Sequence, residues 1–145
     1  MPEEDLAQIK PQVYKDPRPA SHFDRYHARS RTRKPDWVYG MVRMVLTPYL
    51  LIFHRARCIG SDQVPTRGSV IVAPNHFSFL DHFFVAVFLR RYVRFMAKSQ
   101  LFTPPLQFIY RHGGVFPVRR GHRDEEAFIT AEAVLARGGT IVMYP

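Results

Sequence analysis

The chain of 145 residues is long enough for one domain of ordinary size and too short for two independent ones. Charged residues make up 23% of the sequence, which excludes a polytopic membrane protein, and the single cysteine, Cys58, excludes an intramolecular disulfide and a thiolate metal site. The net charge of +9 indicates an anionic partner, for which nucleic acid, a phospholipid surface and a phosphorylated substrate all qualify.

Residues 1–36 are rich in Pro, Lys, Arg and His and show neither a helical nor a strand period. We therefore expect a flexible basic arm that adds nothing to the core. The arm lacks the apolar stretch of a secretory signal, so secretion by that route is not expected.

Residues 37–54 are mostly apolar, with Arg43 and Pro48 as interruptions and aromatic residues near both ends. A membrane-spanning helix needs roughly 20 apolar residues, so this segment fits a membrane-associating helix that lies in, or dips into, the bilayer interface. A buried core helix is the alternative. The basic arm beside the segment favours the membrane, because clustered Lys and Arg are attracted to anionic headgroups. We expect a peripheral or monotopic protein at the cytoplasmic face of a membrane.

Residues 55–145 alternate between strand and helix patterns, which indicates an α/β domain with a layered sheet and flanking helices. The predicted elements are a short strand near 57–60, a buried strand at 69–73 that ends at Pro74, a helix at 80–91, a strand at 92–97, a helix at 105–112, a strand at 115–118, a helix at 124–137 and a buried strand at 140–144. The 124–137 helix places Phe128, Ala131, Val134 and Leu135 on one face.

A histidine and an aspartate follow the strand at 69–73. Pro74 ends the strand, and α/β folds build their sites at the carboxyl ends of strands. His76 then lies in the loop and Asp81 in the first turn of the next helix, so the imidazole can fold back onto the carboxylate. Such a contact fixes the tautomer and leaves the other ring nitrogen to take a proton from a hydroxyl. The pair is a candidate general base.

The same residues also match a helix start. In Ser78-Phe79-Leu80-Asp81 the serine can cap the helix while the aspartate faces its positive end. Capping and catalysis can hold together. The neighbouring phenylalanines at 77, 79, 83 and 84 can line an apolar wall of a site or belong to the core, and the core is favoured for Phe83 and Phe84.

Three ordered blocks resemble the glycerophospholipid acyltransferase family, typified by 1-acyl-sn-glycerol-3-phosphate acyltransferases. The first block, Asn-His-x4-Asp, is Asn75, His76 and Asp81 here, and the second is similar to the run from Gly114 to Arg120. The third begins with an aromatic residue and Pro, as at Tyr144-Pro145, before Glu-Gly-Thr-Arg. From the resemblance we expect 55–145 to be the N-terminal portion of the domain, incomplete within the third block.

The resemblance implies transfer of a fatty acyl group from acyl-CoA or acyl carrier protein to the hydroxyl of a lysophospholipid, without a metal or bound cofactor. His76 would deprotonate this hydroxyl, and Asp81 would orient His76. Arg120, together with Arg119, would hold the acceptor phosphate. Asn75 and Gly114 would belong to the substrate site, and Lys98 would face its entrance or remain an ordinary surface charge.

Two other hypotheses remain beside the enzyme. One is a non-catalytic basic module that binds membranes through the arm, and the other is an incomplete domain that neither folds nor acts. Nucleic-acid binding is not expected, because the sequence has no recognised motif and no basic helix with interleaved aromatic residues. The spacing of His82, His112 and His122 does not indicate a metal site.

Overall fold

The structure is a computed structural model that describes residues 15–144. Within this range the helices are α2 (Asp24–Thr32), α3 (Trp37–Phe53), α4 (Asp81–Phe88), α5 (Leu106–Gly113) and α6 (Glu125–Ala136). The strands are β1 (Val70–Val72), β2 (Arg94–Lys98), β3 (Val115–Val118) and β4 (Thr140–Val142). Short 3-10 turns are η1 (Ala20–Phe23), η2 (Ser61–Gln63) and η3 (Ser99–Leu101).

The strands form one parallel sheet in the order β1-β4-β2-β3. Val72 of β1 pairs with Val142 of β4, and Lys98 of β2 pairs with Val118 of β3. Because the strands share one direction, their carboxyl ends meet at one edge of the sheet and their amino ends at the other.

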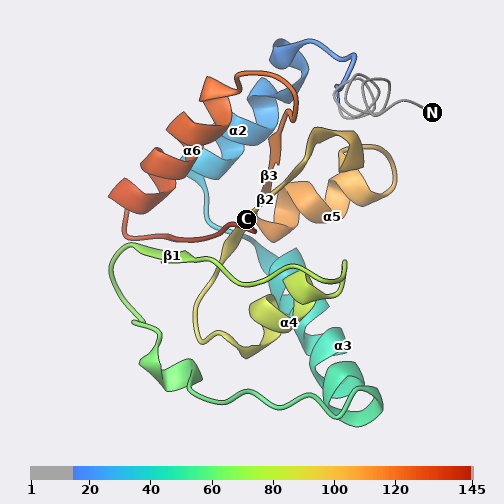
Figure 1. Cartoon of the computed structure of the whole chain (residues 1–145), viewed down its shortest axis with the longest axis vertical. Coiled ribbons are helices and arrows are strands. Elements are labelled where there is room, and N and C mark those ends of the chain that lie inside the picture. Colours follow the sequence, from blue (N-terminus) through green and yellow to red (C-terminus); the bar gives the residue numbers. More distant parts are fainter. Residues whose placement is uncertain (1–14, 145) are drawn as a thin grey trace, which may run out of the picture.

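Side chains alternate between the two faces of the sheet and form separate clusters. Phe95 and Val142 pack in one cluster with Tyr39 of α3. Phe116 and Ile141 pack in another with Ala131 of α6. Helices α2 and α6 lie side by side, and α3 lies against α4 away from them (Figure 1). The predicted α/β class is therefore confirmed, with helices on both faces of a parallel sheet.

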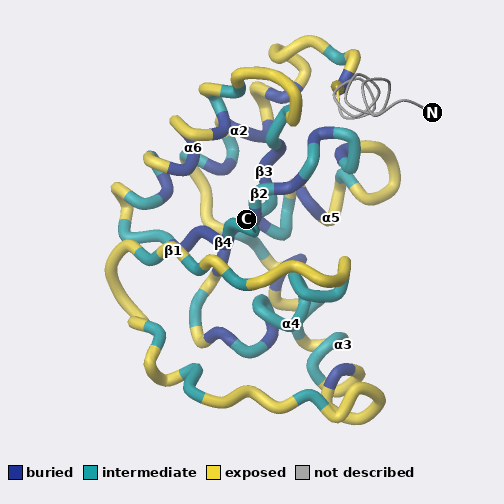
Figure 2. Tube along the Cα trace, in the orientation of Figure 1, coloured by how far each residue is buried: buried dark blue, intermediate teal, exposed yellow. Residues whose placement is uncertain are grey.

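Two strand predictions are wrong. Residues 57–60 form no strand, and the connection between α3 and β1 is mostly exposed (Figure 2). The apolar strand at 69–73 does form, but as an outer strand rather than a buried one. Ile71 is 57% exposed. Helix α6 covers its register partner Ile141 on the neighbouring strand but leaves Ile71 on the outer strand exposed.

The buried face of α6 is rotated from the predicted one. Ala131 and Val134 are buried as expected, whereas Phe128 is 57% exposed. Ala127 and Thr130 are buried instead. The reason is that α6 packs against both the sheet and α2, so its covered face points between the two.

The expectation of a flexible arm is wrong for the part of 1–36 that the structure describes, and residues 1–14 lie outside it. Phe23, Tyr26, His27 and Ser30 are buried at helical spacing on η1 and α2. His27 Nδ1 lies 2.9 Å from the Thr130 hydroxyl of α6. One face of this basic segment therefore joins the core while its charges stay on the other face.

A charged bridge ties the chain before η1 to the segment after β2. Arg18 donates hydrogen bonds to both carboxylate oxygens of Asp16, at 2.9 and 2.7 Å. The same guanidinium donates to the carbonyls of Phe102, at 2.9 Å, and Ser99, at 2.6 Å. Asp16 is 3% exposed, so this ion pair is buried on the acid side.

Helix α3 occupies almost the whole predicted apolar segment. Asp36 caps it by accepting a hydrogen bond from Val38 N at 3.2 Å, and Val38, Tyr39 and Leu50 are its buried residues. Among residues 15–144, no helix is both long and apolar enough to span a bilayer. Association of α3 with a membrane surface stays a prediction.

Candidate active site

His76 and Asp81 lie beyond the carboxyl end of β1, in the connection that leads into α4. β1 ends at Val72, and α4 begins at Asp81 itself, with Leu80 as its N-cap residue. The prediction that Ser78 caps this helix is therefore wrong. His76 Nδ1 lies 3.1 Å from Asp81 Oδ2. The contact that the sequence spacing predicts is therefore formed.

Asp81 also organises the turn before α4. Its Oδ2 accepts hydrogen bonds from the backbone N–H groups of Phe77, at 2.7 Å, and Ser78, at 2.8 Å. The Ser78 hydroxyl accepts from Leu80 N at 3.2 Å. These bonds from Ser78 N and Phe77 N, with the His76 contact, hold the pKa of Asp81 below its usual value. One carboxylate thus serves both the helix start and the histidine.

The hydrogen bond fixes which nitrogen of His76 can act as a base. An ionised carboxylate only accepts hydrogen bonds, so Nδ1 of His76 carries the proton and donates it to Asp81. The lone pair of Nε2 is then left to accept a proton from a substrate. The side chain of His76 is 37% exposed, which leaves it accessible.

Two aromatic side chains that sequence reasoning did not place near His76 pack around it. The ring of Tyr144, which follows β4, lies 4.4 Å from the His76 ring between centroids, and His82 of α4 lies 5.2 Å from it. Only topology reveals the Tyr144 contact: β4 is the neighbour of β1, so the residues that follow the two strands meet. Burial raises the pKa of Tyr144, whose hydroxyl has no partner among the described residues.

His82 is held as a neutral ring. Its Nδ1 donates a hydrogen bond to the carbonyl of Phe79 at 3.1 Å, and burial lowers its pKa. The centroid of its ring lies 4.7 Å from that of Tyr144 and 5.4 Å from that of Phe95, with the rings tilted relative to each other. His82 therefore connects the exposed pair to the interior of the domain.

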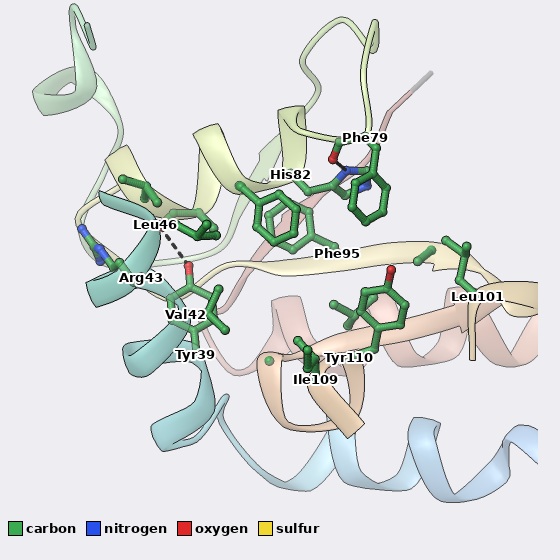
Figure 3. A pocket seen from close by; sticks show the side chains of 16 residues that line it. Tyr39, Val42, Arg43, Leu46, Phe79, His82, Phe95, Leu101, Ile109 and Tyr110 are labelled. Carbon is green, nitrogen blue, oxygen red and sulfur yellow. Dashed lines mark hydrogen bonds between the residues drawn. The ribbon is translucent and has the colours of Figure 1, made fainter. Parts of the chain in front are cut away.

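An apolar cavity begins at His82 and Phe79 and runs between α3, α4, α5 and β2 (Figure 3). Its volume is ≈ 80 Å³, so it is small. Phe83, which sequence reasoning assigned to the core, also lines it. Leu46 of α3 and Ile109 of α5 belong to its walls. Such a cavity suits an unbranched apolar chain better than a polar group.

The two arginines after β3 lie at the far side of the sheet from His76, because β1 and β3 are its outer strands. Arg119 donates from its guanidinium to the Arg18 carbonyl at 3.2 Å, and its buried Nε has no partner among the described residues. Arg120 is exposed. Within residues 15–144, no hydrogen bond or ion pair joins either arginine to the His76–Asp81 pair.

The remaining predicted site residues have separate positions. Lys98 ends β2, at the same edge of the sheet as His76. Asn75, which precedes His76 in the chain, is exposed. Gly114 caps α5 with φ 84°, and a side chain there would come within 2.5 Å of Pro35. This glycine therefore has a structural reason to be glycine, whatever it contacts in a substrate.

No group of three or more His, Cys, Asp or Glu side chains in the described part of the chain is arranged to hold a metal ion. The family model described as Acyltransferase matches residues 55–145, which is more than half of the chain. No curated protein and no solved structure matches.

Proposed function

Because this chain belongs to the acyltransferase family, we propose that it moves a fatty acyl group from a thioester, acyl-CoA or acyl carrier protein, to the hydroxyl of a lysophospholipid such as lysophosphatidate. The observation that carries the proposal is the His76–Asp81 contact at 3.1 Å, which leaves Nε2 of His76 as an accessible base. A base is what a hydroxyl needs to attack a thioester near neutral pH.

The reaction runs through His76. Its Nε2 takes the proton of the acceptor hydroxyl while the oxygen attacks the thioester carbonyl, and Asp81 stabilises the imidazolium that forms. The tetrahedral intermediate collapses by breaking the carbon–sulfur bond, and the departing thiolate receives the proton from His76. The products are an ester and a free thiol, and no further reactant is required.

The acyl chain would enter the cavity that starts at Phe79 and His82 (Figure 3). The His82 ring lies 5.2 Å from that of His76, so the carbonyl of a chain seated there is held close to the base. Burial of the apolar chain supplies binding energy, about 0.8 kcal/mol for each buried methylene. The width and depth of the cavity then set the preferred chain length.

The acceptor phosphate would be held by Arg119 and Arg120. The carboxyl ends of β1 and β3 are three strand spacings apart, about 14 Å. The acceptor would lie along this edge of the sheet, with its hydroxyl at His76 and its phosphate on the side of β3, and the long arginine side chains would reach towards it because the acceptor alone does not bridge the two strands. The Nε of Arg119 is buried and has no hydrogen-bond partner among the described residues, so this guanidinium has a donor to spare for a phosphate oxygen. This supports a movement of Arg119 from its present contact with the Arg18 carbonyl to the phosphate.

Membrane association would use an apolar stripe on α3. Trp37, Met44 and Ile52 are 66%, 70% and 68% exposed, and with Met41 and Tyr49 they follow the helical period along one side. In vesicle flotation, the double change Met44→Glu and Ile52→Glu should abolish binding to anionic vesicles. The control Phe128→Glu, which changes an exposed apolar residue of α6, should not, and equal loss in both variants would contradict the proposal.

Thiol release tests the reaction itself. The purified chain is incubated with palmitoyl-CoA and lysophosphatidate, and the free thiol and the diacyl product are measured. His76→Ala should reduce both by at least about 100-fold, whereas the control His122→Ala, at an exposed position, should not. Equal turnover by wild type and His76→Ala, or no turnover by the wild type with any donor, contradicts the proposal. Replacing lysophosphatidate with a neutral monoacylglycerol then tests the need for a phosphate.

A further inference from the structure

A second cavity lies at the opposite edge of the sheet, where the strands begin. It is formed by the start of β2, the start of β4, the end of α6 and the connection between α2 and α3. Its volume is ≈ 240 Å³, whereas a single water needs on the order of 10–15 Å³ by the same kind of measure. It therefore has room for a ligand larger than one ion.

The lining of this cavity is cationic. Lys34, Arg91, Arg94 and Arg137 all contribute to it, and none of the described residues that line it is acidic. None of these four cations takes part in an ion pair within residues 15–144. Arg29 of α2, by contrast, does form an ion pair, with the carboxylate of Asp36. The cavity thus gathers positive charge that the described part of the chain does not neutralise.

Backbone carbonyls hold Arg91 in place. Its guanidinium donates to the carbonyls of Pro65, at 2.7 Å, and of Gly68 and Gly138, both at 2.8 Å. These bonds fix the position of the cation but leave its full charge, because carbonyls are neutral acceptors. The site is therefore built before any ligand arrives.

Arg94 is the most deeply buried of the four cations. It is 8% exposed, and its guanidinium donates to the carbonyl of Arg33, while Arg137 donates to the carbonyl of Arg31. Burial, helped by the charge of Arg137, lowers the pKa of Arg94 to about 10, so it stays charged at neutral pH. A buried charge without a counterion is unfavourable, and an anion in the cavity would relieve it.

Thr140 gives an independent sign of a ligand. It is 1% exposed and lines the cavity, and its hydroxyl has no hydrogen-bond partner among the described residues. A buried hydroxyl without a partner destabilises a protein, so native structures rarely keep one unless something else satisfies it. An anionic oxygen is an acceptor that this hydroxyl and the surrounding cations would share.

We propose that this cavity binds a phosphate monoester, with Lys34, Arg94 and Arg137 supplying the charge and the Thr140 hydroxyl donating a hydrogen bond. The monoester belongs either to a soluble metabolite or to the headgroup of a phosphatidate-like lipid. The site lies at the amino ends of the strands, whereas His76 lies beyond the carboxyl end of β1, so it is distinct from the proposed acyl-transfer site.

Calorimetric titration of the full chain with glycerol 3-phosphate tests the soluble source, and flotation with phosphatidylcholine vesicles containing phosphatidic acid tests the headgroup. Thr140→Val removes the hydroxyl at nearly constant shape, and Arg137→Gln removes an exposed cation. Each should weaken binding about tenfold, the loss of one charge-assisted hydrogen bond. The control Arg123→Gln, whose side chain is exposed and lies outside the cavity, should bind like the wild type.

Melting in phosphate-free buffer separates binding from folding. Thr140→Val should melt at the same temperature as the wild type or higher, because it removes an unsatisfied buried hydroxyl. Variant-sensitive binding to glycerol 3-phosphate assigns the site to a soluble ester, and the same sensitivity seen with vesicles alone assigns it to a headgroup. If neither probe binds, or if both variants bind like the wild type, the proposal is overturned.

Discussion

The junction at Asp36 allows a prediction whose size follows from the structure. The carboxylate caps α3 through Val38 N at 3.2 Å. It also lies 2.5 Å from the guanidinium of Arg29 on α2 and 2.5 Å from Nδ1 of His112 on α5. Three helices therefore depend on one side chain, and Asp36→Ala removes all of these contacts at once.

The expected cost is a sum of modest terms. Loss of the cap costs about 1 kcal/mol. The two charged contacts are worth about 1 kcal/mol each, at the low end for such bonds, because the carboxylate is 26% exposed. A total of about 3 kcal/mol corresponds to a drop of roughly 6–12 °C in melting temperature for a chain of this size. Asp36→Asn keeps a capping oxygen and loses the charge, so it should show about two-thirds of the effect.

Thermal melts followed by circular dichroism between pH 3 and pH 7 check these values. Burial alone would raise the pKa of Asp36, but its hydrogen bonds with His112 and Val38 N and the nearby charges lower it overall. A carboxyl with a lowered pKa stabilises the fold above the ordinary value of 3.8 and loses this contribution as the pH falls. The gap between wild type and Asp36→Ala should therefore shrink at acid pH. A gap below about 2 °C at pH 7 would refute the junction.

Three other perturbations test the packing and the ionisation states. In urea unfolding, replacing the buried Leu50 by Ala should lower the free energy of unfolding by about 2–5 kcal/mol. Replacing the exposed Ile52 of the same helix by Ala should lower it by less than about 0.5 kcal/mol, and equal losses would contradict the orientation of α3. The hydrogen bond from Arg18 lowers the pKa of Asp16. Asp16→Asn should therefore destabilise the fold at pH 7, and progressively less as the pH falls from the ordinary value of 3.8 towards the much lower pKa of the folded state; a pH-independent loss would count against the pair. Burial lowers the pKa of His27, so the unfolded chain binds a proton at this side chain more readily than the folded one. The melting temperature should therefore fall as the pH drops through 6.5. His27→Gln should reduce this dependence of melting temperature on pH, and an unchanged dependence would exclude the buried neutral ring.

Local patterns in the sequence predict the fold where one signal dominates. The strand at 115–118 and the apolar helix from Trp37 are found within one residue of their predicted bounds, because each is a mostly apolar run with clear ends. The prediction failed for α2. There Tyr26, like Phe23 just before the helix, lies among many charged residues, so the composition hides the apolar face. Both side chains are buried against Ala97, Phe102 and Tyr110, which are distant in the sequence.

The site shows the same limit. The contact between His76 and Asp81 follows from five residues of spacing and the start of a helix, so local reasoning finds it. Tyr144 and His82 complete the surroundings of His76, but Tyr144 arrives through strand order, which spacing does not encode. The outer position of β1, with Ile71 exposed, likewise depends on which strands pair.

The rate of acyl transfer by Asp81→Asn tests the central claim most directly. The amide oxygen of asparagine can still accept hydrogen bonds from Phe77 N and Ser78 N, so the start of α4 and the fold should persist. The amide cannot stabilise a charged His76 or hold its Nδ1 proton as a carboxylate does. We predict a fall of about 10²–10⁴-fold in thiol release with an unchanged circular dichroism spectrum. A rate within about twofold of the wild type would show that the His76–Asp81 pair does not act as the base.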